Sequence, residues 1–440
     1  MISFNTRQTC LWIHRYTGLA IAGFLIIAAI TGSLLAFHHE LDDIFNQRLA
    51  HVDKTQTPPF SIASLHDKVI TRYPEYSFST MPIAVEPNRA VVFEVDRDKG
   101  DIKGVPKPLF QEVYINPYTA DIIGARDKDQ WAWHNTMWKV FWLHRELLLG
   151  DIGKLILGIV SLVWTINCFI GFYLTFPRAI KKNHLSPQGS AKKRAPALKR
   201  WLPAWKIRTK TNTFKLNYDV HHAFGLWLWL MLFVIAWSSV GFNLKQIYKP
   251  VMQVVVGLEG KESKGAEGKD NKPNRAGKLD KQALTGLQLS ANDRGAEVVN
   301  KANSIDYLSQ QANIAAQKNG LKVTQLLGIR WVEEDNQWQL RFKTDKDIGK
   351  KSGASSITVN AIDGSIERVN FAYQNASFGN KADQWLSTLH MGHISHGIGH
   401  LLYQIFLALI GLAVAVLSGT GVYLWWKGRQ QRLKSLAKLR

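Results

Sequence analysis

The chain has 440 residues and a formal net charge of +21, because 55 lysines and arginines stand against 34 acidic residues. Its mean hydropathy of −0.12 would suit a soluble protein, but this average conceals four apolar segments that are nearly free of charge. A helix of about 20 apolar residues crosses the roughly 30 Å hydrocarbon core of a bilayer. The composition therefore argues against an ordinary soluble enzyme and predicts four membrane spans, at 19–37, 155–176, 224–244 and 401–426.

The excess of positive charge lies in three segments that flank the predicted spans. Residues 1–15, 177–215 and 427–440 contain 20 of the basic residues and no acidic residue, which leaves the remainder of the chain almost neutral. Basic segments next to spans stay on the cytoplasmic side of the membrane, so we expect both termini and the middle loop to be cytoplasmic. Their position also favours anionic lipid head groups as partners and argues against nucleic acid.

Two long segments between the spans, 40–143 and 245–388, combine helix-like and strand-like patterns. In the first segment a helix-like stretch and two strand-like stretches lie at 61–72, 90–95 and 111–127. In the second, two helix-like stretches and then two strand-like stretches lie at 281–302, 307–320, 336–343 and 355–369. Residues 257–281 are rich in glycine and lysine and are typical of a flexible loop. We expect two small α+β modules outside the membrane.

The two halves of the chain resemble each other. "IHRYTG" opens the first span and "VHHAFG" opens the third, while "LHRELLLGDIGK" and "LHMGHISHGIGH" precede the second and fourth. We infer a duplicated unit of span, outer module and span, and hence a helical membrane protein with a four-span bundle and two α+β modules. The expected order is N-terminus with span one, first module, span two, basic loop, span three, second module, span four and basic tail, at 1–39, 40–143, 144–176, 177–216, 217–244, 245–388, 389–426 and 427–440.

The duplication places one histidine at an equivalent position by each span. His14 and His221 belong to the cytoplasmic ends, and His144 and His390 to the outer ends. Two neutral imidazoles from neighbouring helices are the axial ligands that a six-coordinate haem iron needs. Because the chain has no C-x-x-C-H motif for covalent attachment, the histidines predict two b-type haems that carry electrons across the bilayer.

Other histidines compete for these positions. The outer haem could use His39 with His396 or His400, and His222 could replace His221. The histidines of 390–400 could instead hold zinc or iron, although no cysteine or pair of acids completes that set. The plainest alternative is that these side chains only anchor helix ends at the interface. Against it stands the cost of ionisable groups at spans, which are usually functional.

Several segments carry a family resemblance. "IHRYTGLAIAGFLIIAAITGSLLAFHHELD", "YDVHHAFGLW" and "GTGVYLWWKGR" resemble the PepSY-associated transmembrane-helix family of bacterial inner-membrane proteins, and "EVYINPYTADIIG" is similar to the closing hairpin of a PepSY module. The resemblance implies a multi-pass inner-membrane protein with haem ligands at His14, His144, His221 and His390. It also implies reduction of a ferric siderophore in the periplasm. The pair His221-His222 departs from the usual His-Arg of the family.

We therefore expect a haem-dependent transmembrane ferric (siderophore) reductase that passes electrons to a periplasmic ferric chelate. Reduction would release iron as Fe(II), because the hard oxygen donors of a siderophore match Fe(III) better. No G-x-G-x-x-G follows a strand, so we expect quinol or a cytoplasmic reductase to donate the electrons. The alternative is a membrane-anchored periplasmic binding or regulatory module without redox activity. A permease is disfavoured because the spans carry few charges away from their ends.

Overall fold

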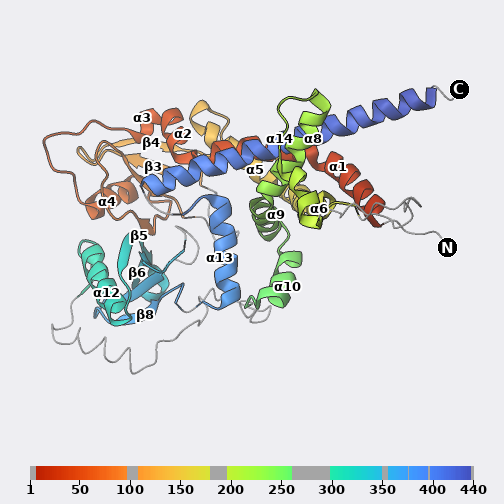
Figure 1. The fold of residues 1–440 in the computed structure, drawn as a ribbon. Coiled ribbons are helices and arrows are strands. Elements are labelled where there is room, and N and C mark those ends of the chain that lie inside the picture. The colour runs from red at the N-terminus through yellow and green to blue at the C-terminus, as the bar shows by residue number, and fades with distance from the viewer. Residues whose placement is uncertain are drawn as a thin grey trace.

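The structure, a computed structural model, describes residues 6–96, 108–178, 196–259, 298–348, 355–374, 376–394 and 397–437. Three of its helices are long and apolar enough to cross a membrane, namely α1 (Thr6–Leu35), α6 (Gly150–Thr175) and α14 (Ile398–Ala437). A fourth span is formed if the bent pair α8 (Thr213–Trp227) and α9 (Trp229–Asn243) counts as one. Figure 1 shows the strands at the left and the membrane helices extending to the right, with α14 running across much of the molecule.

The third predicted span, 224–244, is not one straight helix. Leu228 lies outside the helical region at φ −103° and ψ 1°, and α8 and α9 meet there at 71°. No proline stands between Thr213 and Asn243, so the bend comes from packing and not from a missing donor. We attribute it to the different neighbours of the two halves, because α8 packs against α14 and α9 packs against α6.

Close backbone contacts hold the membrane helices together. α1 packs against both α14 and α6, and Ser33 of α1 donates a hydrogen bond to the carbonyl of Ala408 at 3.1 Å. A Cβ on Gly411 would lie 2.1 Å from the Ser33 hydroxyl oxygen, so only glycine permits this approach. Small residues at the crossing points are typical of helices packed within a bilayer.

The shorter helices lie at the ends of the spans and between them. α5 (Thr136–Glu146) precedes α6, and α13 (Phe378–Met391) precedes α14. The remaining short helices and 3-10 turns are α2 (His38–Phe45), α3 (Gln47–Ala50), η1 (Trp133–Asn135), α7 (Ala197–Trp201), η2 (Leu202–Trp205), α10 (Lys245–Val256) and η3 (Glu333–Asp335). Most of the predicted helix at 281–302 and most of the predicted loop at 257–281 lie outside the described residues.

The extramembrane part contains two antiparallel sheets with one helix each. The first half contributes α4 (Ile62–Arg72) and the order β2-β3-β4, with strands Val91–Glu94, Glu112–Ile115 and Ile122–Arg126. The second half contributes α12 (Ser304–Lys318) and the strands β5 (Val323–Val332), β6 (Gln337–Thr344), β7 (Ser355–Asn360) and β8 (Ile366–Asn370). Strands lie where the sequence predicts them, but β5 and the two-residue strand Thr80–Met81 were not predicted.

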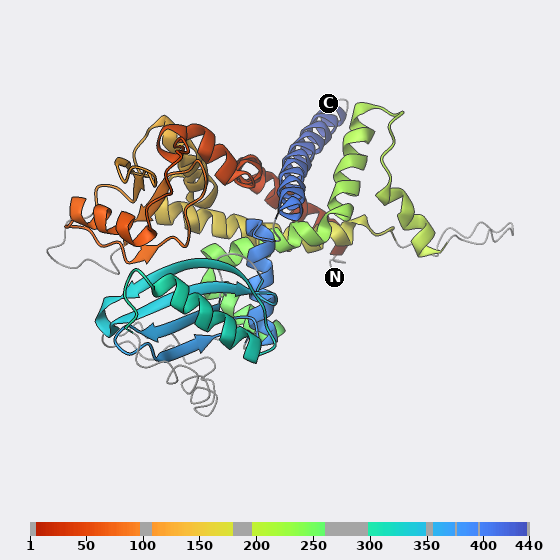
Figure 2. The same ribbon diagram turned by 90° about the vertical axis from the view of Figure 1, so that its left-hand side faces the viewer.

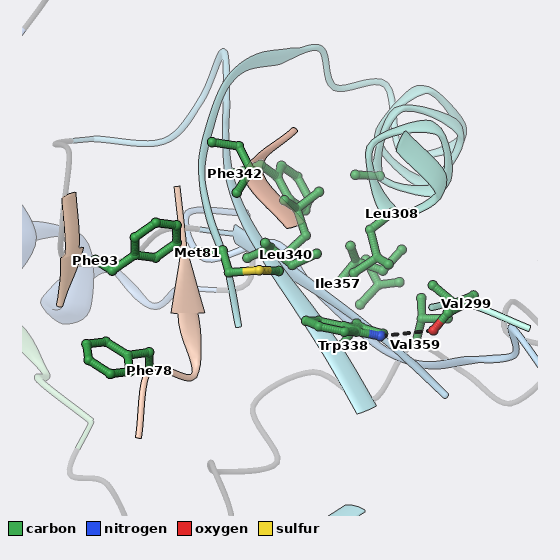
Figure 3. Packing of buried hydrophobic residues seen from close by; sticks show 14 of the residues in the cluster. Phe78, Met81, Phe93, Val299, Leu308, Trp338, Leu340, Phe342, Ile357 and Val359 are labelled. Atoms are coloured by element: carbon green, nitrogen blue, oxygen red, sulfur yellow. Dashed lines mark hydrogen bonds between the residues drawn. The ribbon is translucent and has the colours of Figure 1, made fainter. Parts of the chain in front are cut away.

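The structure adds that the two modules are joined. β1 (Thr80–Met81), from the first half, pairs with β5, so that Met81 stands opposite Ile329 and the sheet order is β1-β5-β6-β7-β8. One buried core runs through both halves and includes Phe93, Leu340 and Phe342, and Figure 3 shows Met81 between Phe93 and Leu340. Figure 2 shows the two parts side by side. We call this body, residues 40–135 and 298–374, the extramembrane unit.

Candidate functional site

The structure brings the four repeat-related histidines together as two pairs. His14 of α1 faces His221 of α8, with ring centroids 6.3 Å apart and the rings at 70°. His144 of α5 faces His390 of α13, again at 6.3 Å, with the rings at 67°. A metal ion bound between two imidazole nitrogens, at about 2 Å from each, sets the ring centroids about 6 Å apart. Each pair therefore has the spacing of two ligands on opposite sides of one metal ion.

Hydrogen bonds at Nδ1 fix the orientation of three of the rings. Nδ1 of His144 lies 3.0 Å from the Ala28 carbonyl oxygen, and Nδ1 of His221 lies 3.1 Å from the Leu417 carbonyl oxygen. A carbonyl can only accept, so in both rings Nδ1 carries the proton and Nε2 keeps a free lone pair. A histidine that binds a metal ion through Nε2 requires this tautomer, in which Nδ1 donates a hydrogen bond to the protein.

The third ring is oriented by a hydroxyl. Nδ1 of His390 lies 2.8 Å from the Ser238 hydroxyl oxygen, and that hydroxyl donates its own proton to the Val234 carbonyl at 2.7 Å. The oxygen of Ser238 must therefore accept from Nδ1, which leaves Nε2 of His390 unprotonated. The fourth ring, that of His14, lies beside Asn167 of α6, whose side chain and backbone are its hydrogen-bonding partners.

Glycines make room for the imidazoles against neighbouring helices. A Cβ built on Gly32 would lie 3.0 Å from Cε1 of His144, and one on Gly171 would lie 3.1 Å from Cε1 of His14. On Gly421 it would lie 3.4 Å from Cε1 of His221. These distances are at or below ordinary van der Waals contact. Each ring therefore packs directly on the backbone of the neighbouring helix, and a side chain in place of the glycine would displace the ring.

A sharp turn after His144 positions α5 against α6. Leu147 and Leu148 both have a positive φ, of 53° and 59°, which non-glycine residues rarely adopt. A Cβ on Gly153 would lie only 1.7 Å from the Glu146 carbonyl oxygen. The glycine nine residues after His144 thus has a structural reason, since it lets the first turn of α6 lie against the end of α5.

The competing histidines occupy other surroundings. Nδ1 of His222 lies 3.1 Å from the carbonyl of Tyr218 on its own helix, and the two rings stack at 4.0 Å. The ring of His39 contacts that of His38 at 5.6 Å, and Nδ1 of His400 lies 3.2 Å from the Ile394 carbonyl. The geometry of the pairs favours His221 over His222, and His144 with His390 over His39 or His400. His396 lies outside the described residues.

Each pair supplies only two ligands. Within the described ranges no three His, Cys, Asp or Glu side chains come together in a way that could hold a metal ion. Apolar side chains fill the core of the helix bundle, among them Ile21, Leu25, Val160, Leu232 and Val414. A group that brings its own equatorial donors and an apolar surface would suit both the ligand count and this lining.

Buried charges connect the end of α1 to the extramembrane unit. Arg126 is only 1% exposed and makes two hydrogen bonds, each of 2.8 Å, to the carboxylate of Asp42 on α2. It also donates to Asn135 at 2.9 Å. Beside it, Arg89 binds Asp43 through two hydrogen bonds of 2.7 Å. This network was not predicted, although the acidic residues of "HHELDD" directly after the first span are its signal in the sequence.

The Arg89 guanidinium lowers the pKa of the Asp43 carboxyl below its usual range, against an opposing effect of partial burial. Close to this pair lies a shallow pocket of about 630 Å³, whose lining includes His51, Asp53 and Asn88. These side chains are exposed, and within the described part of the chain they belong to no group of three or more His, Cys, Asp or Glu side chains that could hold a metal ion.

One comparison with known proteins identifies the family. The family model described as "PepSY-associated TM region" matches residues 11–428, nearly the whole chain and both histidine pairs. The chain belongs to this family. The resemblance read from the sequence is thereby confirmed, and the PepSY-associated protein is a membrane protein. No curated protein matches it.

Proposed function

We propose that this PepSY-associated protein is a di-haem reductase of the bacterial inner membrane. It passes electrons to a periplasmic ferric chelate, such as a ferric siderophore, and releases iron as Fe(II). The proposal rests on the two histidine pairs. In each pair the ring centroids lie 6.3 Å apart, and the two histidines come from different helices. If the four histidines only anchored helix ends at the membrane interface, there would be no reason for their imidazoles to lie in two facing pairs.

The residues of each pair fit the axial positions of a haem. Nε2 of His144, His221 and His390 has its lone pair available because Nδ1 carries the proton. A haem would bring its own nitrogen donors to the iron, so the two imidazoles of a pair would be enough protein ligands to hold it. When bound, such a haem supplies a one-electron couple between Fe(III) and Fe(II).

The pairs lie near opposite ends of α1. His14 stands in its third turn, and Gly32, which faces His144, follows 18 residues later. At 1.5 Å per residue this is about 27 Å along the helix, close to the thickness of the hydrocarbon core. Two haems held there would form a relay from one face to the other, fed by quinol or by a cytoplasmic reductase that docks on the basic face. The basic segments would also contact anionic lipids, with both termini cytoplasmic.

The test is a visible absorption spectrum of detergent-purified full-length protein, made with ample haem supply and measured before and after dithionite. The proposal expects a Soret band that shifts on reduction, α and β bands, and about two haems per chain. Reduced protein mixed with a ferric siderophore should then be reoxidised, with Fe(II) captured by a ferrous chelator. Colourless protein would contradict the proposal and favour a periplasmic binding or regulatory module without redox activity.

A further inference from the structure

The two imidazoles of each pair lie in crossed planes. The rings of His14 and His221 make an angle of 70°, and those of His144 and His390 make an angle of 67°. Two facing rings on separate helices could adopt any angle between parallel and perpendicular. The two pairs come from different helices and nevertheless share nearly the same angle, which requires a common cause in the surroundings of the rings.

Each ring lies against one turn of a neighbouring helix, and the four turns are built alike. The backbone carbonyl of the first residue of each turn is a hydrogen-bonding partner of the ring, and the last residue is a glycine or, once, a serine. The turns are 28–32 of α1 facing His144, 167–171 of α6 facing His14, 235–239 of α9 facing His390, and 417–421 of α14 facing His221.

A polar side chain of the same turn gives each ring a second partner. Three of the turns carry a hydroxyl at their fourth residue, within 3.1 Å of Nδ1, and these residues are Thr31, Ser238 and Thr420. In the turn 167–171 the fourth residue is Ile170, and the side chain of Asn167 is the partner of His14 instead. Because Nδ1 lies in the plane of the ring, acceptors at fixed places on a helix fix the rotation of that plane about the direction of the Nε2 lone pair.

The glycines hold the same edge of the ring by close packing. A Cβ on Gly32, Gly171 or Gly421 would lie 3.0, 3.1 or 3.4 Å from Cε1 of the ring that it faces. Cε1 is the ring atom next to Nδ1, so hydrogen bonds and packing act on two neighbouring atoms. Two fixed atoms at one edge leave the ring little freedom to rotate.

We infer that these four turns set the planes of the axial ligands, so that each haem of the proposed function has crossed imidazoles. The polar members of the turns are then positioning residues, namely Thr31, Asn167, Ser238 and Thr420. Hydrogen bonds that orient the ligands are among the means by which a protein controls a haem. This inference rests on the proposed function.

The angle between the rings acts on the electrons of the iron. An imidazole donates π density into the iron d orbital that lies perpendicular to its plane. Parallel imidazoles act on one such orbital, whereas crossed imidazoles act on two and leave them close in energy. Rings that keep their planes when the iron changes between Fe(III) and Fe(II) also reduce the rearrangement that accompanies each electron transfer.

The test is electron paramagnetic resonance of the purified, oxidised holoprotein. Low-spin Fe(III) with crossed axial ligands gives a strongly anisotropic signal dominated by one feature at low field, and parallel ligands give a rhombic signal with three resolved features. The inference expects two signals of the first kind, one for each histidine pair. A pyridine haemochrome assay of the same samples measures their haem content.

A glycine variant tests the packing against the ring. Gly32→Ala places a methyl group 3.0 Å from Cε1 of His144, so it should shift the low-field feature of the His144–His390 site and leave the other signal unchanged. Gly23→Ala is the matched control on the same helix, because no described atom lies within 4 Å of its Cβ position. It should shift neither signal.

A serine variant tests the hydrogen bond. Ser238→Ala removes the hydroxyl that lies 2.8 Å from Nδ1 of His390 and should shift the same signal as Gly32→Ala, whereas Ser238→Thr keeps a hydroxyl and should restore it. Ser161→Ala is the control, because it removes a buried hydroxyl that donates to the Leu157 carbonyl at 2.7 Å. It should leave both signals in place.

The outcomes separate this inference from the proposed function. Two haems with rhombic signals would overturn the inference and leave the di-haem proposal standing, and so would crossed-plane signals that ignore both Gly32→Ala and Ser238→Ala. Equal shifts in the two controls would also overturn it. If Gly32→Ala loses its haem, Ser238→Ala decides. Protein without haem would end both the inference and the proposed function, and crossed-plane signals without reduction of a ferric chelate would end only the assignment of the substrate.

Discussion

Polar side chains serve different purposes in the membrane helices and in the extramembrane unit. Among the helices, hydroxyls such as Thr31 and Ser238 bind histidines and so act on a site. In the extramembrane unit, Arg126 and Asp42 bind each other and hold two segments in place. The same change, loss of one polar group, should therefore alter ligand binding in the first region and stability in the second. Single substitutions in each region test that division.

The largest expected effect is loss of a whole site. His221→Ala removes one of the two nitrogens that face each other at 6.3 Å, so the haem content per chain should fall by half. His222→Ala is the matched control, because its ring stacks on Tyr218 and bonds to its own helix. A pyridine haemochrome assay measures the haem content of both variants. Equal losses of haem in the two would mean that the assignment of His221 as the ligand is wrong.

Arg126→Met should destabilise the extramembrane unit strongly. It leaves the carboxylates of Asp42 and Glu112, 17% and 10% exposed, without their guanidinium partner. Breaking such a buried pair costs about 3–5 kcal/mol. Arg89→Met, at a half-buried surface pair, should cost no more than about 1 kcal/mol. Limited proteolysis and thermal unfolding in detergent measure both, and a similar small loss in the two variants would contradict the role of burial.

Met81→Ala tests whether the two halves share one core. Met81 is 1% exposed and lies in the short strand β1, which pairs with β5 of the other half. Removing a buried Met side chain costs about 2–5 kcal/mol. Ile362→Ala, at a side chain that is 66% exposed, serves as the control. Protease cleavage in both halves is expected for Met81→Ala, and cleavage confined to the first half would argue for separate modules.

The smallest effect is a pH dependence at Asp43. Hydrogen bonds from Arg89 lower the pKa of this carboxyl in the folded protein, so its contribution is complete above the ordinary aspartate value of about 3.9. That contribution is lost as the pH falls further, because the carboxyl must then take up a proton. The melting temperatures of the unaltered protein and Asp43→Asn should accordingly differ at neutral pH and converge in acid. A constant difference would exclude the mechanism.

The sequence located the four paired histidines because repetition at span ends is a pattern along the chain. It could not locate Thr31, Ser238 or Thr420, since a hydroxyl becomes a histidine partner only when two helices are placed side by side. The bend at Leu228 was missed for the same reason, because it depends on α8 and α9 packing against different helices. The strand β1 has two residues, too few for any periodicity, so the sheet that joins the modules had no local signal.

Each histidine pair takes one member from the chain before α7 and one from the chain after it. His14 and His144 belong to the first half, and His221 and His390 belong to the second. Neither half alone could complete a pair. Two identical copies of one half would form two pairs as well, but every substitution would then appear beside both histidines of the same pair. Holding both halves in one polypeptide allows the surroundings of the two histidines of one pair to differ, as Ile170 near His14 differs from Thr420 near His221.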